Sequence, residues 1–129
     1  MPPPPRSTGA TRKDDLRVRT RAFAGGIVRG YCGLPLKRFE VQVLGKQMLR
    51  AGTSVGANYR EASRSRSREE FVSKVEVCAQ EADETQYWIE LLTKEYSVSD
   101  TRLEDLWFEA NELISIFVTM ARNAKKAGT

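Results

Sequence analysis

The stretch that decides the fold is SREEFVSKVEVCAQEADETQYWIELLTKEY, residues 67–96. Its apolar and small residues recur at alternating steps of four and three, which on an α-helix stack into one stripe. That stripe consists of Phe71, Val75, Cys78, Ala82, Thr85, Ile89, Leu92 and Tyr96. Ser67 and Glu70 have the S-x-x-E spacing of a capping box, which satisfies unpaired amides in the first turn of a helix. A helix of roughly 40 Å with a single apolar stripe needs partner helices.

Three other segments have the same periodicity and supply those partners. Their stripes are Leu16, Thr20, Phe23, Ile27, Tyr31 and Leu34 in the first, Leu44, Met48, Ala51, Val55, Asn58 and Ala62 in the second, and Leu106, Ala110, Leu113, Phe117, Met120 and Ala124 in the last. Gly33 and Pro35 end the first helix, and Thr101 with Glu104 offers a capping box for the last. We expect helices at about 14–32, 36–63, 68–96 and 101–126.

Four amphipathic helices joined by short turns predict an all-α fold, an antiparallel up-down-up-down four-helix bundle. A chain of 129 residues supports one domain with a buried core, and we expect it at residues 13–126. Residues 1–12 are proline-rich and then polar, which is typical of a flexible tail. No stretch approaches the ~18 uncharged residues of a membrane span, and the start lacks the apolar run of a signal peptide. We therefore expect a cytoplasmic protein with no membrane contact.

Glycines and cysteines occupy informative positions in these stripes. Gly52 and Gly56 are spaced so that a neighbouring helix can approach closely. Because arginines lie beside them, the spacing indicates tight packing in a soluble bundle, with ligand contact as the alternative. Cys32 and Cys78 fall at apolar periodic positions, so we expect two buried, reduced thiols.

Charge is unevenly distributed along the chain, although the net charge is only +4. Residues 1–50 hold 11 basic and 3 acidic side chains, residues 51–74 hold 5 and 3, and residues 75–129 hold 5 and 11. This uneven charge distribution can place opposite charges on neighbouring helices or subunits, which then attract each other. It can also leave a basic surface that binds phosphate groups.

Serine and arginine alternate over SRSRSR, residues 63–68, so this connection is predicted to be an exposed turn. It belongs to a basic cluster made of Arg60, Arg64, Arg66, Arg68 and Lys74. A second basic patch on the first helix consists of Arg17, Arg19 and Arg21. A guanidinium can fork onto a phosphate, which favours nucleic-acid binding. The nearby Glu61, Glu69 and Glu70 leave a salt-bridged surface as an equal alternative.

The sequence offers little for catalysis. It contains no histidine, the commonest general base and metal ligand. A di-metal site could be sought at the carboxylates Glu81, Asp83 and Glu84. Di-metal sites in helical bundles use Glu-x-x-His pairs, which a chain without histidine cannot form. There is no glycine-rich phosphate loop and no nucleophile with a candidate partner. We therefore expect a non-enzyme with no metal and no cofactor.

A polar set remains on the second and third helices, which would meet if they run antiparallel from the turn. Its members are Asn58, Glu61, Glu81 and Glu84, with Arg60 in reach. We interpret this set as a hydrogen-bonded network that fixes the helix register.

Three blocks of the sequence carry a resemblance: TSVGANYREA at 53–62, REEF at 68–71 and EADETQYWIELL at 81–92. In order and spacing the chain resembles the small bacterial four-helix bundle proteins encoded in intervening sequences of 23S ribosomal RNA genes. The likeness runs from about Leu16 through NELISIFV, 111–118, to the lysines near the end. The proline tail and the glycines of the first helix lie outside the family pattern.

The resemblance implies the four-helix fold and a homo-oligomer, since related bundles form five-fold rings, so that a pentamer is favoured. It also implies kinship with accessory proteins of the reverse transcriptases of diversity-generating retroelements, in which a basic ring binds RNA and the enzyme. No catalytic residue transfers, because the family has no established active site.

Two hypotheses follow. In the first, an oligomeric, non-catalytic bundle binds RNA or a ribonucleoprotein through its arginines. In the second, the protein is a protein-binding scaffold or accessory subunit whose arginines pair with the acidic C-terminal half of an adjacent subunit. The first predicts arginines exposed on one face, and the second predicts arginines covered by carboxylates.

Overall fold

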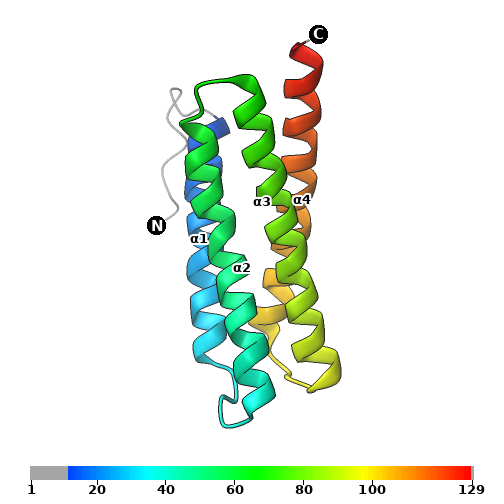
Figure 1. The fold of residues 1–129 in the computed structure, drawn as a ribbon. Helices are drawn as coiled ribbons and strands as arrows, with labels where there is room; N and C mark the ends of the chain where they lie inside the picture. Colours follow the sequence, from blue (N-terminus) through cyan, green and yellow to red (C-terminus); the bar gives the residue numbers. More distant parts are fainter. Residues whose placement is uncertain (1–11, 129) are drawn as a thin grey trace, which may run out of the picture.

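The structure, a computed structural model, describes residues 12–128. It contains α1 (Arg12–Cys32), α2 (Phe39–Ser63), α3 (Arg68–Glu90), the π-helical turn η1 (Leu91–Glu95) and α4 (Thr101–Ala127) (Figure 1). The tail predicted at residues 1–12 lies outside the described residues except for Arg12, with which α1 begins. Within the described part of the chain, no helix has an apolar run long enough to cross a membrane.

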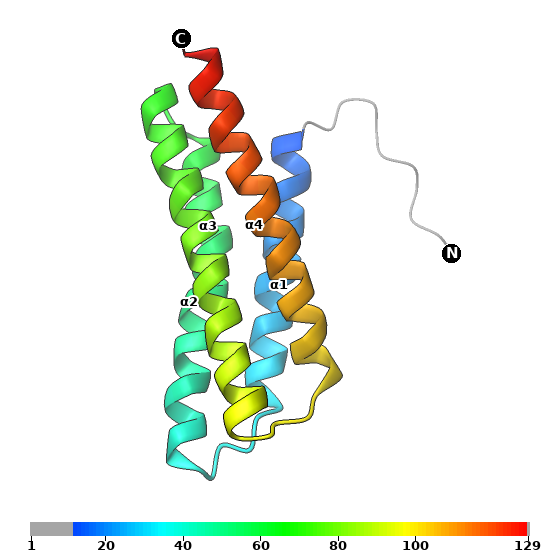
Figure 2. The same cartoon turned by 90° about the vertical axis from the view of Figure 1, so that its right-hand side faces the viewer.

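The four helices run alternately up and down, which confirms the antiparallel four-helix bundle. α2 packs against α1 and α3, α3 packs against α4, and α1 meets α4 over a smaller contact. Figures 1 and 2 show that the first turn of α1, the α2–α3 connection and the end of α4 lie at one end of the bundle. We call this the turn end.

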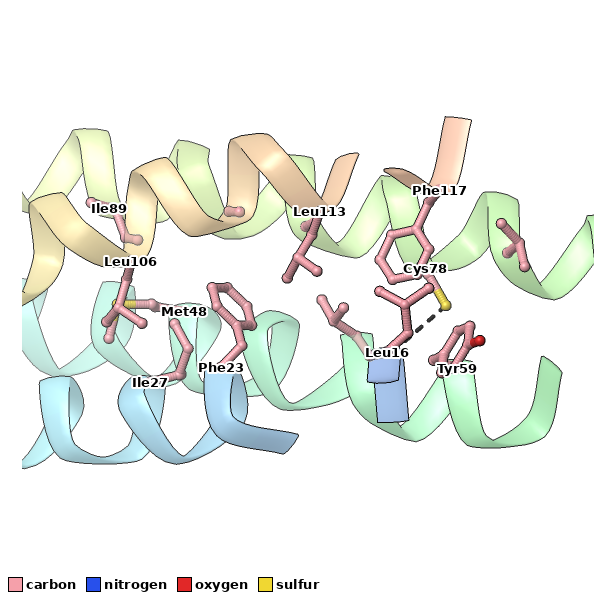
Figure 3. Packing of buried hydrophobic residues seen from close by; sticks show 14 of the residues in the cluster. Leu16, Phe23, Ile27, Met48, Tyr59, Cys78, Ile89, Leu106, Leu113 and Phe117 are labelled. Atoms are coloured by element: carbon pink, nitrogen blue, oxygen red, sulfur yellow. Dashed lines mark hydrogen bonds between the residues drawn. The ribbon is translucent and has the colours of Figure 1, made fainter. Parts of the chain in front are cut away.

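The central stripe of α3 forms the middle of the core. Val75, Cys78, Ala82, Thr85, Ile89 and Leu92 are all buried, as the four-three spacing predicts. Apolar residues of the other three helices pack onto this stripe along the length of the bundle (Figure 3). Near the turn end, the rings of Tyr59 and Phe117 pack with centroids 5.8 Å apart.

The buried stripe of α2 differs from the predicted one. Val41, Gly45 and Tyr59 are buried, whereas the predicted Leu44 and Asn58 are only partly buried. The register shifts because α2 turns a line of glycines toward α1. A Cβ on Gly45 would lie 2.6 Å from Leu34 Cδ1, so this contact has no room for a larger residue.

The connections differ from the predicted ones in detail. α2 begins at Phe39, after a turn in which the amide of Arg38 bonds to the carbonyl of Pro35. The third helix was expected to continue to residue 96, but α3 gives way to the π-helical turn η1 and the chain then reverses through Ser97, whose φ is 53°. A positive φ on a non-glycine residue is uncommon and marks a tight reversal.

Both predicted capping boxes change partners. Ser67 Oγ accepts a hydrogen bond from the Glu70 amide at 3.1 Å, as expected, but the Glu70 carboxylate accepts from the amide of Arg66. At α4 the cap is Asp100 rather than Thr101, because Asp100 Oδ1 accepts from the Arg102 amide at 2.9 Å. An aspartate side chain one residue earlier satisfies the same first-turn amides.

The two cysteines have different environments. Cys78 is buried, and its Sγ donates to the Val55 carbonyl at 3.6 Å. Burial raises the pKa of the Cys78 thiol to about 12. Cys32, in contrast, is exposed at the end of α1, so the prediction of two buried thiols is wrong for Cys32.

Candidate nucleic-acid interface

The turn end of the bundle is basic. Residues 15–21, 56–76 and 118–128, which the antiparallel packing gathers there, contain 11 basic and 5 acidic side chains. The charge gradient along the sequence therefore becomes a difference between the two ends of the folded molecule.

A groove on the outer side of α1 lies next to this end. It has a volume of about 740 Å³ and is walled by Arg17, Arg21, Arg29 and Arg60. The small or short side chains Val18, Ala22 and Gly25 line it between the arginines. We call this feature the arginine groove.

Gly25 shapes the arginine groove. A Cβ on Gly25 would lie 3.3 Å from Arg29 Nη1, so the Arg29 guanidinium folds back along α1 and lies over the bare glycine. This brings Arg29 toward the preceding arginines of the same helix. A longer side chain at position 25 would fill the space that the guanidinium uses.

A second hollow of about 290 Å³ continues the groove between α1 and α2. Arg17, Arg21 and Arg60 border this hollow as well, together with small residues such as Gly56 and Ala57. The structure thus brings Arg60 of α2 next to the patch predicted on the first helix. Arg60, predicted as part of the turn cluster, therefore shares one surface with Arg17 and Arg21, which were predicted as a separate patch.

Arg29 belongs to this surface although sequence reasoning left it out of the site. The available signal was its spacing of eight residues from Arg21, which on a helix places both on nearby faces. The same rule separates Arg19 from Arg17 and Arg21, because residues two apart do not face each other.

Arg19 points toward α4 instead. Its Nε and Nη2 donate to the Glu109 carboxylate at 2.8 and 2.7 Å, and Nη2 also donates to Glu112. These hydrogen bonds, offset in part by desolvation, raise the pKa of the Arg19 guanidinium. Arg19 therefore joins α1 to α4 and lies outside the arginine groove.

The α2–α3 turn carries two further arginines, Arg64 and Arg66, and both are exposed. Arg68, the first residue of α3, lies against the end of α4: a Cβ on Gly128 would be 3.1 Å from Arg68 Nη1. A cation at this place complements the negative end of the α4 dipole. Lys74 donates to Glu61 at 2.9 Å. Of the predicted turn cluster, Lys74 thus has a salt-bridge partner, whereas Arg68 lies beside the end of α4 and forms no salt bridge with a described residue.

The remaining arginines of this surface form no salt bridge with any described residue. They are Arg17, Arg21, Arg29, Arg60, Arg64 and Arg66. Elsewhere in the described chain, Arg50 and Arg102 have carboxylate partners, whereas Arg122, Lys46 and Lys94 form no salt bridge. What distinguishes the groove and the turn is that six such arginines gather there.

The predicted polar network divides into separate contacts. Arg50 binds Glu81 at 3.3 Å and also Glu84, far along the bundle from the Glu61–Lys74 pair near the turn. Asn58 Nδ2 donates to the carbonyl of Ser54 in its own helix at 2.8 Å. The prediction of one network is wrong because antiparallel pairing sets position 61 opposite 74 and position 50 opposite 81–84.

Two of the three carboxylates considered for metal binding, Glu81 and Glu84, have these other partners, and Asp83 is exposed. Glu84 accepts from Trp88 Nε1 at 3.1 Å in addition to Arg50. Among the described side chains of residues 15–128, no three or more Asp, Glu or Cys side chains gather in a way that could hold a metal ion.

Comparison with known proteins identifies the family of this chain. Residues 15–119 match the family described as 23S rRNA-intervening sequence protein. The chain belongs to the 23S rRNA-intervening sequence protein family. The match begins in the first turn of α1 and ends within α4, and it spans both the arginine groove and the turn.

A solved structure supports this family membership. The chain is 34% identical, with a TM-score of 0.74, to a protein of unknown function from the S23 ribosomal protein family of Bacteroides thetaiotaomicron VPI-5482. The similarity covers 82% of this chain and 97% of that one. Comparison with curated proteins gives no match.

Proposed function

We propose that this member of the 23S rRNA-intervening sequence protein family is a non-catalytic, oligomeric bundle that binds RNA or a ribonucleoprotein through its basic surface. The observation that carries the proposal is the gathering on one surface of six arginines, exposed except for the half-buried Arg17, that form no salt bridge with a described residue. Arg19 and Arg50 use their charge in ion pairs with carboxylates of the bundle. The arginines of the groove and turn form no such pair with any described residue.

Guanidinium chemistry fits this role. Arginine presents a planar fork of donors that matches two phosphate oxygens, and it is less strongly hydrated than lysine. A surface that neutralises several phosphates also releases condensed counterions, which drives binding. On this proposal the protein works in the bacterial cytoplasm, where RNA is made.

The proposal is tested by equilibrium binding of the purified protein to a structured RNA. Arg17→Gln/Arg21→Gln/Arg60→Gln removes three charges from the groove, and Arg64→Gln/Arg66→Gln removes two from the turn. A matched control, Lys46→Gln/Lys94→Gln, removes two exposed charges from the other half of the bundle. We expect the first two variants to weaken binding by about tenfold or more and the control to bind like wild type. Equal affinities in all four proteins contradict the proposal.

A second candidate function rests on the outer faces of α3 and α4. Asp83, Glu104 and Asp105 are exposed there, and they form no salt bridge with any residue of the described chain. Carboxylates on one side of the bundle and arginines on another are complementary, so that neighbouring copies can pair head to tail in a ring. In this alternative the protein is a scaffold or accessory subunit, for example of a reverse transcriptase, and a pentamer is the favoured ring.

The two candidates differ in what the arginines do to the assembly. If they pair with carboxylates of an adjacent subunit, the groove variant lowers the mass measured by light scattering, and high salt does the same. If they face nucleic acid, the assembly keeps its mass while RNA affinity falls.

A further inference from the structure

We infer that the basic surface recognises the phosphate backbone of a double-helical nucleic acid and does not read bases; this inference rests on the proposed function. It follows from which side chains accompany the arginines. Sequence is read by free hydrogen-bond donors and acceptors aimed at base edges, and single strands are held by aromatic rings that stack on bases. No Asn, Gln, Asp, Glu or aromatic side chain lines the groove or its continuation toward α2. The free donors there are arginine guanidinium groups, whose forks fit phosphate oxygens as well as guanine.

The polar side chains beside the groove direct their donors to the helix backbone. Thr53 Oγ1 donates to the carbonyl of Leu49 at 2.8 Å, and Thr20 Oγ1 donates to that of Leu16 at 2.7 Å. Asn58 of α2 does not line the groove or its continuation, and one of its amide hydrogens donates to the Ser54 carbonyl.

The serines between the arginines of the turn are used in the same way. Ser63 Oγ donates to the Arg60 carbonyl at 2.8 Å, and Ser65 Oγ donates to the Glu61 carbonyl at 3.4 Å. Ser67 caps α3. Each hydroxyl therefore holds the turn in shape, and the arginines are left as the groups that face outward.

Exposed aromatic rings are found away from this surface. Phe39, which is 72% exposed, begins α2 at the opposite end of the bundle, and Tyr87 and Phe108 are 53% and 64% exposed in the second half of α3 and the first half of α4. No aromatic side chain lines the arginine groove or its continuation toward α2. Bases pulled out of a helix would find no ring to stack on.

The groove arginines are also held at fixed spacing. Arg17, Arg21 and Arg29 belong to one continuous helix, so their Cα atoms span about 18 Å along its axis. A duplex presents one charge per ~1.7 Å of axis, against one per ~3.4 Å for each strand, and its phosphates are held in a regular array. A fixed row of cations without stacking rings should therefore bind a duplex more tightly than a single strand, because the phosphates of a duplex are denser and more regularly spaced.

The test compares four probes of equal length on the full chain: two RNA duplexes of unrelated sequence, a DNA duplex and an unstructured single-stranded RNA. We expect the two RNA duplexes to bind within about threefold of each other, because a protein that reads bases loses about tenfold or more for a single wrong base pair. We expect the single strand to bind at least about fivefold more weakly than either RNA duplex. The DNA arm shows whether the surface distinguishes the two helix forms.

The outcomes separate this inference from the proposed function. Tighter binding of the single strand, or a tenfold preference between the two RNA duplexes, overturns the inference while the RNA-binding function stands. Binding of no probe, or binding that is unchanged in Arg17→Gln/Arg21→Gln/Arg60→Gln, overturns the proposed function itself. A variant that retains the helical circular-dichroism spectrum and the melting temperature of wild type shows that any loss is not a loss of fold.

Discussion

Gly52 of α2 lies directly against Ile27 of α1: a Cβ on Gly52 would be 2.6 Å from Ile27 Cγ1. This distance is shorter than carbon atoms tolerate, so the backbone of α2 approaches α1 only because position 52 carries no side chain. The close approach also fixes how near Arg60 lies to Arg17 and Arg21. The packing of the helices and the geometry of the candidate site therefore depend on the same contact.

Gly52→Ala should lower the free energy of unfolding by about 1–3 kcal/mol, because the new methyl group overpacks against Ile27. Gly56→Ala is the matched control: its Cβ would meet Thr20 at an ordinary 3.4 Å. There the better helix propensity of alanine should leave stability unchanged or raise it by up to about 1 kcal/mol. Urea denaturation measures both, and similar losses in the two variants would contradict the packing described.

Arg19→Gln should lower the stability of the fold without changing affinity for RNA. Loss of the contacts to Glu109 and Glu112 should lower stability by at most about 1 kcal/mol, because the ion pairs are partly exposed. Affinity for RNA should stay near that of wild type, since Arg19 points to α4. Arg21→Gln, two residues along on another face of α1, should show the reverse: unchanged thermal stability and weaker binding. Equal effects of the two substitutions on RNA affinity would argue against the groove as the site.

Asp100 should make stability depend on pH. Hydrogen bonds from Arg102 hold the pKa of the Asp100 carboxyl below its ordinary value. A folded-state pKa that is lowered means that the carboxylate stabilises the fold above the unfolded pKa of about 3.9 and stops doing so as pH falls through the lower folded value. Asp100→Ala should cost about 1 kcal/mol at neutral pH. The gap between wild type and variant should narrow below about pH 4, and a gap independent of pH would contradict the assignment.

The two thiols should differ in reactivity. Cys32 is exposed, whereas burial raises the pKa of Cys78 to about 12. Because the thiolate is the reactive form, an alkylating reagent should modify Cys32 in the folded protein and Cys78 only after denaturation. Peptide mass spectrometry after a short exposure distinguishes the two sites. Early labelling of Cys78 would show that the core near Val55 opens readily.

Sequence periodicity predicted the fold well because a bundle repeats one simple pattern. The stripe of α3 contains side chains of clear hydropathy, such as Val75 and Ile89, and each of its six central positions is buried. The stripe of α2 was harder to place. Its inward positions include Gly45 and Gly52, which contribute no hydrophobic side chain, and their role depends on how closely α1 approaches.

The candidate site was predictable only in part. Arg17, Arg21 and Arg60 were named from the sequence, but their common surface depends on how α1 lies against α2. Arg19 and Arg68 were also predicted as binding residues because they are close in sequence to these arginines. Closeness in sequence does not show which face of a helix packs against which neighbouring helix. Their positions against α4 required the tertiary arrangement, as did the role of Gly25 beneath Arg29.

The most direct test of the central claim is the salt dependence of RNA-duplex binding by wild type and by Arg17→Gln/Arg21→Gln/Arg60→Gln. Counterion release makes log affinity fall linearly with log salt, with a slope near 0.9 for each neutralised phosphate. We predict a steep slope for wild type that becomes shallower by roughly two to three in the variant, while Lys46→Gln/Lys94→Gln keeps the wild-type slope. Identical slopes in all three proteins would contradict RNA binding by the arginine groove. They would instead favour a role of the unpaired arginines in contacts between subunits.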